Sequence, residues 1–257
     1  HQHFWKYHPQ KQDWISDDMA ALKQDFLPAQ IKPLLQDENL DGCITVQCEQ
    51  NTDEISFMLQ LAKDNEFIKG IVGWIDLRAD KLEEQLSHYA QHKLLKGFRH
   101  IVQAEPDKNF LLRKDFCKGI SLLKQFGFTY DILIYHYQLE AAIQFVRLFP
   151  EQPFVIDHIA KPDIKNHEID VWAKQMKQIA ESENVVCKIS GMVTEADLAN
   201  WKKKDILPYM DIVFESFGAE RMMFGSDWPV CLLAANYHTV YSIVADYISA
   251  LSKDERD

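Results

Sequence analysis

The 257-residue sequence has no uninterrupted apolar run approaching the roughly 18 to 20 residues needed to span a bilayer. Basic residues are also fewer than acidic ones: the sequence has 28 Lys and Arg and 39 Asp and Glu, which gives a net charge of -11. A chain this acidic opposes the phosphate neutralisation on which nucleic-acid binding mostly depends. We therefore expect a soluble globular protein that spans no membrane and binds no nucleic acid.

Several chemical signatures are missing as well. The five cysteines are scattered and form no Cys-x-x-Cys pair, which argues against a disulfide framework and a cysteine zinc site. There is neither a phosphate-binding Gly-x-x-x-x-Gly-Lys-Ser/Thr motif nor a Gly-x-Ser-x-Gly nucleophile elbow. The cysteine usage predicts a cytoplasmic protein. Because the chain does not begin with Met, we expect its natural N-terminus to lie upstream, which leaves a signal peptide open.

What the sequence does contain is a series of short apolar runs at the spacing of a strand-plus-helix unit. They cover residues 42–47, 70–76, 96–101, 130–134, 154–158, 185–190 and 222–227. Near-continuous apolar runs of this length are typical of strands buried on both faces of a parallel sheet. With the segment that ends at His3, they make eight predicted strands.

Apolar residues at helical spacing lie between these runs, as in Ile55, Met58 and Ala62. Strands that alternate with helices predict a single α/β domain over residues 1–257, a (β/α)₈ TIM barrel whose first strand and C-terminal end are incomplete in this chain. The stretch 6–36 predicts a long first loop over the barrel mouth, with a helix around 28–36. An open doubly wound sheet is the main alternative, but the glycine-rich turn it normally carries is missing here.

Polar residues end nearly every predicted strand. They are Gln47, Asp76, Arg99, His100, Asp131, His158, Lys188, Ser190 and Asp227. In a barrel of this kind the carboxyl ends of the strands converge on one mouth, where the chemistry occurs. Because an unpaired buried charge is costly, the pattern predicts mutual pairing, a bound ion or a polar cavity.

Individual positions allow more than one interpretation. Asp131 begins its run, so we expect a structural cap. Asp157 and His158 alternate along a strand, so we expect Asp157 to face outward and brace a helix while His158 faces inward. Arg99 and Lys188 either pair with a neighbouring Asp or act in the site.

His1 and His3 would point to one face of an extended strand, where both could hold one cation or one water. The alternative is a tag remnant or a frayed surface segment. Asp227 closes an apolar run directly before Trp228-Pro229, which fix the following loop, so we expect a functional carboxylate there.

The ordered motifs are His1-x-His3-Phe4-Trp5, KGFRH at 96–100, DHIAKP at 157–162, KISG at 188–191 and GSDWP at 225–229. As a set they resemble the amidohydrolase superfamily, and more narrowly the amidohydrolase-2 branch that includes sugar lactonases and dicarboxylate lactonases. The resemblance covers essentially the whole chain. It implies a TIM-barrel hydrolase that opens a sugar-derived or small carboxylated lactone, as in carbohydrate or aromatic catabolism.

The resemblance also implies roles for particular residues. Asp227 would be the general base that takes a proton from the attacking water. His158 would polarise the lactone carbonyl or donate to the developing oxyanion. Anchors for substrate hydroxyls or a carboxylate would be Arg99, Lys161 and Lys188, with Arg99 counted among the catalytic residues. We further expect substrate contacts from His100, Gln47 and Trp228.

His1, His3 and Asp227 would complete a site for one divalent ion, with zinc favoured by the donor types. A binuclear centre is not expected, because Arg99-His100 stands where a bridging lysine or glutamate would be. Alternatively, no metal binds, and the two histidines only hydrogen-bond to the substrate or to Asp227. No organic cofactor is expected.

Two other functions stay open at this point. One is metal-dependent decarboxylation of an aromatic or unsaturated acid, since the same branch resembles such decarboxylases. The other is a non-catalytic barrel that binds a sugar acid. The sequence does not fix the ring size of the substrate, and it leaves a homo-oligomer open.

Overall fold

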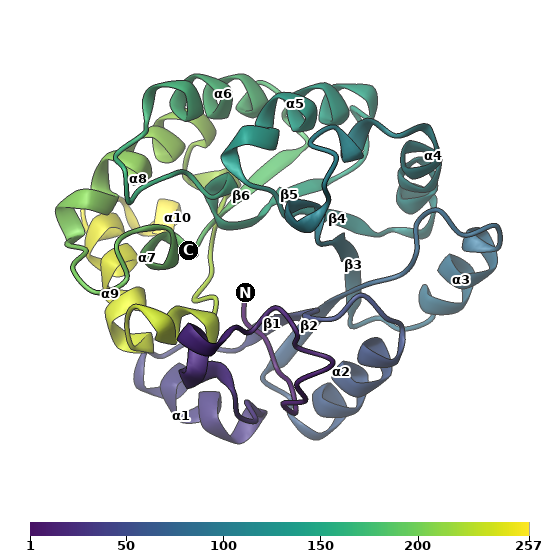
Figure 1. Cartoon of the computed structure of the whole chain (residues 1–257), viewed down its shortest axis with the longest axis horizontal. Coiled ribbons are helices and arrows are strands. Elements are labelled where there is room, and N and C mark those ends of the chain that lie inside the picture. Colours follow the sequence, from purple (N-terminus) through teal and green to yellow (C-terminus); the bar gives the residue numbers. More distant parts are fainter. Residues whose placement is uncertain (257) are drawn as a thin grey trace.

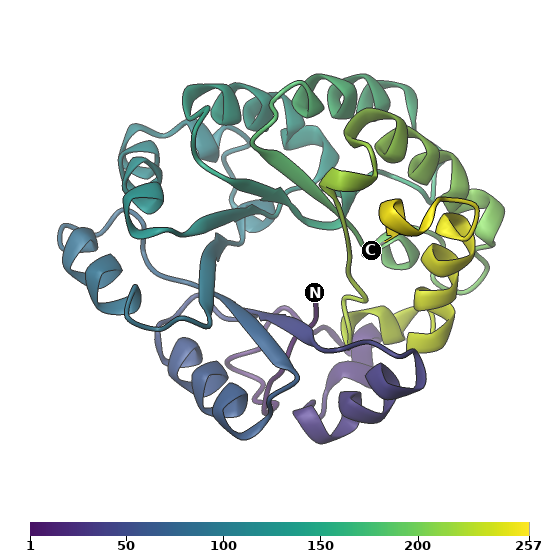
Figure 2. The same cartoon turned by 180° about the vertical axis from the view of Figure 1, so that it is seen from behind.

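The computed structural model describes residues 1–256. A parallel sheet of seven strands, hydrogen-bonded in the order β1 to β7, curls into a ring with helices on its outside (Figures 1 and 2). The strands are β1 (Cys43–Val46), β2 (Ile68–Gly73), β3 (Leu95–His100), β4 (Thr129–Ile132), β5 (Phe154–Ile156), β6 (Val185–Ile189) and β7 (Met222–Phe224). Each of the seven runs predicted between residues 42 and 227 therefore contains a strand or most of one, although the runs 154–158 and 222–227 extend past the strand ends.

The predicted eighth strand, ending at His3, is not confirmed as a strand. Gln2 forms one isolated parallel bridge with Thr45 of β1 and another with Trp228. The next bridge is antiparallel and joins Trp5 to Phe26, so the backbone leaves the sheet direction soon after Gln2. One bridging residue thus lies between the two edges of the sheet, at the place where the eighth strand of a barrel would lie.

The helices surround the sheet. They are α1 (Pro28–Asp37), α2 (Asp53–Asp64), α3 (Leu82–Tyr89), α4 (Lys114–Leu123), α5 (Leu139–Leu148), α6 (Asp170–Ala180), α7 (Met192–Glu195), α8 (Lys203–Phe217), α9 (Tyr237–Ile248) and α10 (Lys253–Arg256). Apolar residues at helical spacing form the buried face of these helices, as shown by Leu82 and Leu86 in α3. None of the helices in residues 1–256 combines the length and hydropathy of a membrane span.

The segment between Trp5 and α1 contains a 3₁₀ helix (Asp17–Leu22) and packs on the barrel through aromatic rings. Phe26 contacts Trp5 and Trp228 edge to face, with ring centroids 5.2 Å apart in both pairs. Trp228 is only 2% exposed. This packing fixes the first segment against the residues that follow β7, which include Asp227.

The five cysteines are free thiols, as their spacing predicts. Cys48, Cys187 and Cys231 are buried, and burial raises the pKa of each thiol. A thiol with a raised pKa is a poor nucleophile, so these three cysteines are unsuited to nucleophilic chemistry.

Candidate active site

A cavity of about 650 Å³ lies at the carboxyl ends of the strands. Its lining includes residues that directly follow strands, among them Ile101 after β3 and Leu133 after β4, together with His3, Arg99, His158, Lys161 and Asp227. A smaller cavity of about 360 Å³ is lined by His1 and Gln2, but its lining contains none of the five polar residues just named. The larger cavity is therefore the candidate active site.

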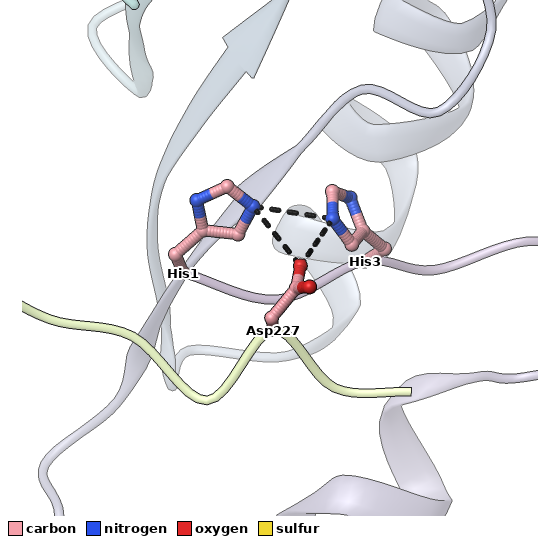
Figure 3. A group of neighbouring side chains, drawn as sticks. All are labelled: His1, His3 and Asp227. Carbon is pink, nitrogen blue, oxygen red and sulfur yellow. Dashed lines mark hydrogen bonds and ion pairs between the residues drawn. The ribbon is translucent and has the colours of Figure 1, made fainter. Parts of the chain in front are cut away.

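Three side chains predicted to act together meet beside this cavity, whose lining includes His3 and Asp227 (Figure 3). Nε2 of His3 lies 3.1 Å from Oδ1 of Asp227 and 3.1 Å from Nε2 of His1. Nε2 of His1 lies 3.7 Å from the same carboxylate oxygen. Residues separated by more than two hundred positions in the chain thus gather within contact distance.

The protonation of His3 indicates what this group can bind. Its Nδ1 lies 2.8 Å from the carbonyl oxygen of Val46, which can only accept, so Nδ1 carries the hydrogen. In the neutral ring Nε2 then presents a lone pair to the carboxylate of Asp227. Two acceptors that face each other at 3.1 Å require a proton or a cation between them.

The donor set fits a metal ion. Two ligand atoms that bind one zinc ion at tetrahedral angles, each about 2.0–2.1 Å from it, lie roughly 3.3 Å apart. The three separations among His1, His3 and Asp227 run from 3.1 to 3.7 Å and bracket that value. These residues can therefore hold one divalent cation.

The backbone around Asp227 brings its carboxylate to this point. Asp227 adopts a left-handed conformation with φ of 54°, and its N–H donates to the carbonyl of His1 over 3.0 Å. Burial alone would raise the pKa of Asp227, but the neighbouring His158 and His3 hold that pKa well below its ordinary value. The group is therefore a carboxylate at neutral pH, as a general base must be.

His158 approaches the same oxygen from the turn that follows β5. Its Nε2 lies 3.7 Å from Oδ1 of Asp227, and its Nδ1 is hydrogen-bonded to the hydroxyl of Ser190 over 2.8 Å. Burial lowers the pKa of His158 to about 4, so the ring is neutral at pH 7. When the hydroxyl of Ser190 donates to Nδ1, Nε2 carries the hydrogen and becomes a donor.

The expected orientation of Asp157 is wrong. It is fully buried and faces inward, where Nη1 of Arg99 lies 2.7 Å from Oδ2 and Nζ of Lys188 lies 2.7 Å from Oδ1. The strand ends at Ile156, and the next residues are not extended, because His158 has φ of 54° and begins a left-handed turn that runs to Lys161. Alternation therefore stops between Asp157 and His158, and both face the interior.

Asp131 is not a cap either. It lies within β4, is 1% exposed and pairs with Lys188. Lys188 thus lies between Asp131 and Asp157 and is buried beneath the cavity rather than lining it. Of the two interpretations for Lys188, the structure shows pairing with aspartate.

Arg99 lines the cavity and is held rigidly. Besides Asp157, its guanidinium contacts Gln47, with Nη2 2.5 Å from the carbonyl oxygen and 2.9 Å from Oε1. Gln47 is fully buried and lies outside the lining. Its contacts are those of a residue that positions Arg99.

Two more predicted substrate contacts lie away from the cavity lining. His100 hydrogen-bonds to Glu105 over 2.6 Å and stacks on Phe110 with ring centroids 4.8 Å apart. Trp228 packs among the aromatic rings described above. Lys161, in contrast, lines the cavity and lies 3.4 Å from Oε1 of Glu195.

Comparison with known proteins identifies the family. The family model described as amidohydrolase matches residues 1–257. The chain belongs to the amidohydrolase family. This confirms the resemblance read from the ordered motifs.

The amidohydrolase is 38% identical to a Burkholderia multivorans protein named L-fucono-1,5-lactonase, an alignment that covers 100% of this chain and 90% of the relative. A protein of the same name from Burkholderia ambifaria is 30% identical over 92% of this chain and 81% of its own length. A crystal structure of a Burkholderia multivorans amidohydrolase with bound zinc superposes with a TM-score of 0.95 at 38% identity, and covers 100% of this chain and 93% of that one.

Several residues of the amidohydrolase site escape sequence reasoning. The sequence shows Ser190 as a polar residue at the end of a predicted strand, but it does not show that Ser190 is hydrogen-bonded to His158. Glu195 lies outside every predicted strand, and the sequence carries no signal that would place it next to the cavity. Trp14 belongs to the loop predicted over the barrel mouth, but nothing in the sequence marks it as a residue of the lining. Gly191 packs against the ring of His158, a contact that depends on the left-handed turn after β5.

Proposed function

We propose that this amidohydrolase opens the ring of a sugar-derived lactone by attack of water, with Asp227 as general base. The observation that carries the proposal is the convergence of His1, His3 and His158 within 3.7 Å of one oxygen of Asp227, a residue of the cavity lining. The two Burkholderia relatives named L-fucono-1,5-lactonase support the reaction class and point to a 6-deoxy sugar lactone.

The charges around the cavity favour a neutral lactone over a carboxylated one. A substrate carboxylate needs an available cation, and Arg pairs with carboxylates best through two parallel hydrogen bonds. Arg99 is already engaged by Asp157 and Gln47, and Lys161 lies next to Glu195. A hydroxyl group is a suitable partner for such neutralised pairs, because it can donate as well as accept.

The reaction follows from the placement of these groups. Asp227 accepts a proton from a water molecule while the oxygen of that water bonds to the lactone carbonyl carbon. Nε2 of His158 donates to the oxyanion that forms. The ring C–O bond then breaks, Asp227 returns the proton to the leaving oxygen, and the product is the open-chain hydroxy acid.

We further propose that His1, His3 and Asp227 hold zinc, the ion in the Burkholderia multivorans structure. A bound divalent ion would polarise the carbonyl and lower the pKa of water. Lys161 and Arg99 would position the substrate hydroxyls, and Gln47 would act through Arg99.

The architecture around the site is part of the proposal. Residues 1–257 would work as one domain in which the segment around Gln2 takes the place of the eighth barrel strand. Residues 6–27 would cover the mouth, since Gln10, Lys11 and Trp14 line the cavity. The cytoplasmic location and a homo-oligomer stay predictions.

The proposal is tested by following acid release from L-fucono-1,5-lactone, related aldonolactones and a carboxylated lactone. We expect turnover of the sugar lactones and a fall in kcat of about 10²- to 10⁴-fold in Asp227→Asn. Asp246→Asn, which alters an exposed ion pair with Lys203, is the matched control. Unchanged kcat in Asp227→Asn would refute the role of the base, and CO₂ release from an aromatic acid would favour the decarboxylase. Binding of L-fuconate without turnover of any lactone would favour a binding protein.

A further inference from the structure

The cavity contains one large aromatic surface that the proposed reaction does not use. Trp14 lines the cavity and is 37% exposed, the one tryptophan among residues 1–256 that is exposed to this degree. Exposing so large an apolar side chain forgoes the free energy of burying it, which makes an exposed ring inside a concave site informative.

The exposure of Trp14 is built into the fold. Two nearby residues of the segment are buried, with Gln12 1% and Ile15 5% exposed. Nε2 of Gln12 donates to Oε1 of Glu49 over 2.8 Å, which fixes this part of the segment to the residues after β1. Trp14 is therefore presented to the cavity by an anchored backbone.

A second tryptophan supports the ring. Trp5 is 2% exposed and meets Trp14 edge to face, with centroids 5.9 Å apart and an interplanar angle of 86°. Nε1 of Trp5 donates to the carbonyl of Gln24 over 2.9 Å, so the supporting ring is itself held in place. This arrangement orients the indole of Trp14 before any ligand binds.

The same lining contains the polar and charged side chains of Asp227, His158, Arg99 and Lys161. A cavity with both an aromatic surface and hydrogen-bonding groups suits a ligand with an apolar face and polar edges. The ring of a sugar lactone has both, since its C–H bonds form the faces and its hydroxyls point outward.

We infer that Trp14 is a substrate-contacting residue that stacks on the C–H face of the lactone ring. This inference rests on the proposed function. Stacking acts on the bound ring before and during the reaction alike, so it contributes to binding more than to the chemical step.

The test compares Trp14→Phe, Trp14→Leu and Trp14→Ala in the hydrolysis of L-fucono-1,5-lactone. We expect KM to rise at least roughly tenfold in the Ala and Leu variants with kcat within about threefold, and Phe to restore most of the affinity. Leu keeps apolar bulk without an aromatic face, so it separates stacking from simple burial. Trp201→Phe is the matched control, because Trp201 lies outside the cavity lining.

A second readout does not depend on turnover. Titration of the wild type with L-fuconate should change the tryptophan emission, and Trp14→Phe should abolish the change while Trp201→Phe keeps it. An unaltered KM in Trp14→Leu, or a fall in kcat at constant KM, would overturn the inference while leaving lactone hydrolysis intact. Failure of the wild type to hydrolyse any lactone would instead refute the proposed function.

Discussion

Gly191 lies directly against the imidazole of His158. A Cβ atom added at Gly191 would be 2.8 Å from Cβ and 2.9 Å from Nδ1 of His158, closer than real contacts allow. Gly191 also has φ of 67°, a conformation that L-residues rarely adopt. The absence of a side chain at this position therefore sets where the imidazole can lie.

Gly191→Ala should reduce activity by at least about tenfold, because a displacement near 1 Å can cost a hundredfold in rate. Gly127→Ala is the control, since Gly127 also has a left-handed φ, of 76°, but has nothing within 4 Å of an added Cβ. Both variants should lose about 1 kcal/mol of stability from the backbone conformation. Urea unfolding measures the loss of stability, and kcat measures the loss of activity. Equal kcat in Gly191→Ala and Gly127→Ala would contradict the role of Gly191 beside His158.

Asp157 should be among the most important side chains for stability. It is fully buried between the cations of Arg99 and Lys188, and together these two hold its pKa below the ordinary value against the opposing effect of burial. Asp157→Asn leaves both cations undercompensated, which should cost about 3 kcal/mol or more. Urea unfolding at pH 7 measures the loss.

The control for Asp157 is an exposed pair, Lys177 with Glu215 at 3.1 Å. Glu215→Gln should cost less than about 1 kcal/mol, because both partners are solvated and the interaction is screened. A similar cost for the two substitutions would mean that the buried network is unimportant for stability.

The sequence predicts the fold better than it predicts this network. Apolar runs are read locally, so the seven strands are predicted from them. The grouping of His1 and His3 with Asp227 is implied by the resemblance of the ordered motifs to a known family, and the structure brings the three side chains together. Lys188 of β6 and Asp131 of β4 come from strands that are not neighbours in the sheet, and only the curvature of the ring brings them together. Asp157 fails the alternation rule because the strand stops one residue before it.

Glu54 should make stability depend on pH. Its carboxylate oxygens accept hydrogen bonds from the backbone N–H groups of Cys48 (2.8 Å) and Glu49 (2.9 Å), yet burial raises its pKa to about 7 from an ordinary 4.5. Between these two values the folded protein holds a proton that the unfolded chain has lost. The free energy of unfolding should therefore fall as pH rises from 4.5 to 7, by up to about 3 kcal/mol.

Glu54→Gln removes the titrating group, so its unfolding free energy should change less over this pH range than that of the wild type. Glu84→Gln is the control, because the side chain of Glu84 is 74% exposed. Urea unfolding at pH 5 and pH 7.5 measures the three proteins. Parallel pH dependence in wild type and Glu54→Gln would exclude a raised pKa at Glu54.

Metal binding should depend on His3. Because Nδ1 of His3 is bonded to the carbonyl of Val46, the lone pair of Nε2 is fixed toward Asp227, and the protein needs no rearrangement to use it as a ligand. Protein stripped with a chelator and titrated with zinc against a chromophoric competitor should bind one ion per chain, and His3→Ala should bind it at least about tenfold more weakly. His92→Ala, which alters a histidine outside this group, should bind as the wild type does. If the stripped wild type takes up no zinc, or if His3→Ala binds zinc as tightly, then His1 and His3 serve only as hydrogen-bonding groups beside Asp227.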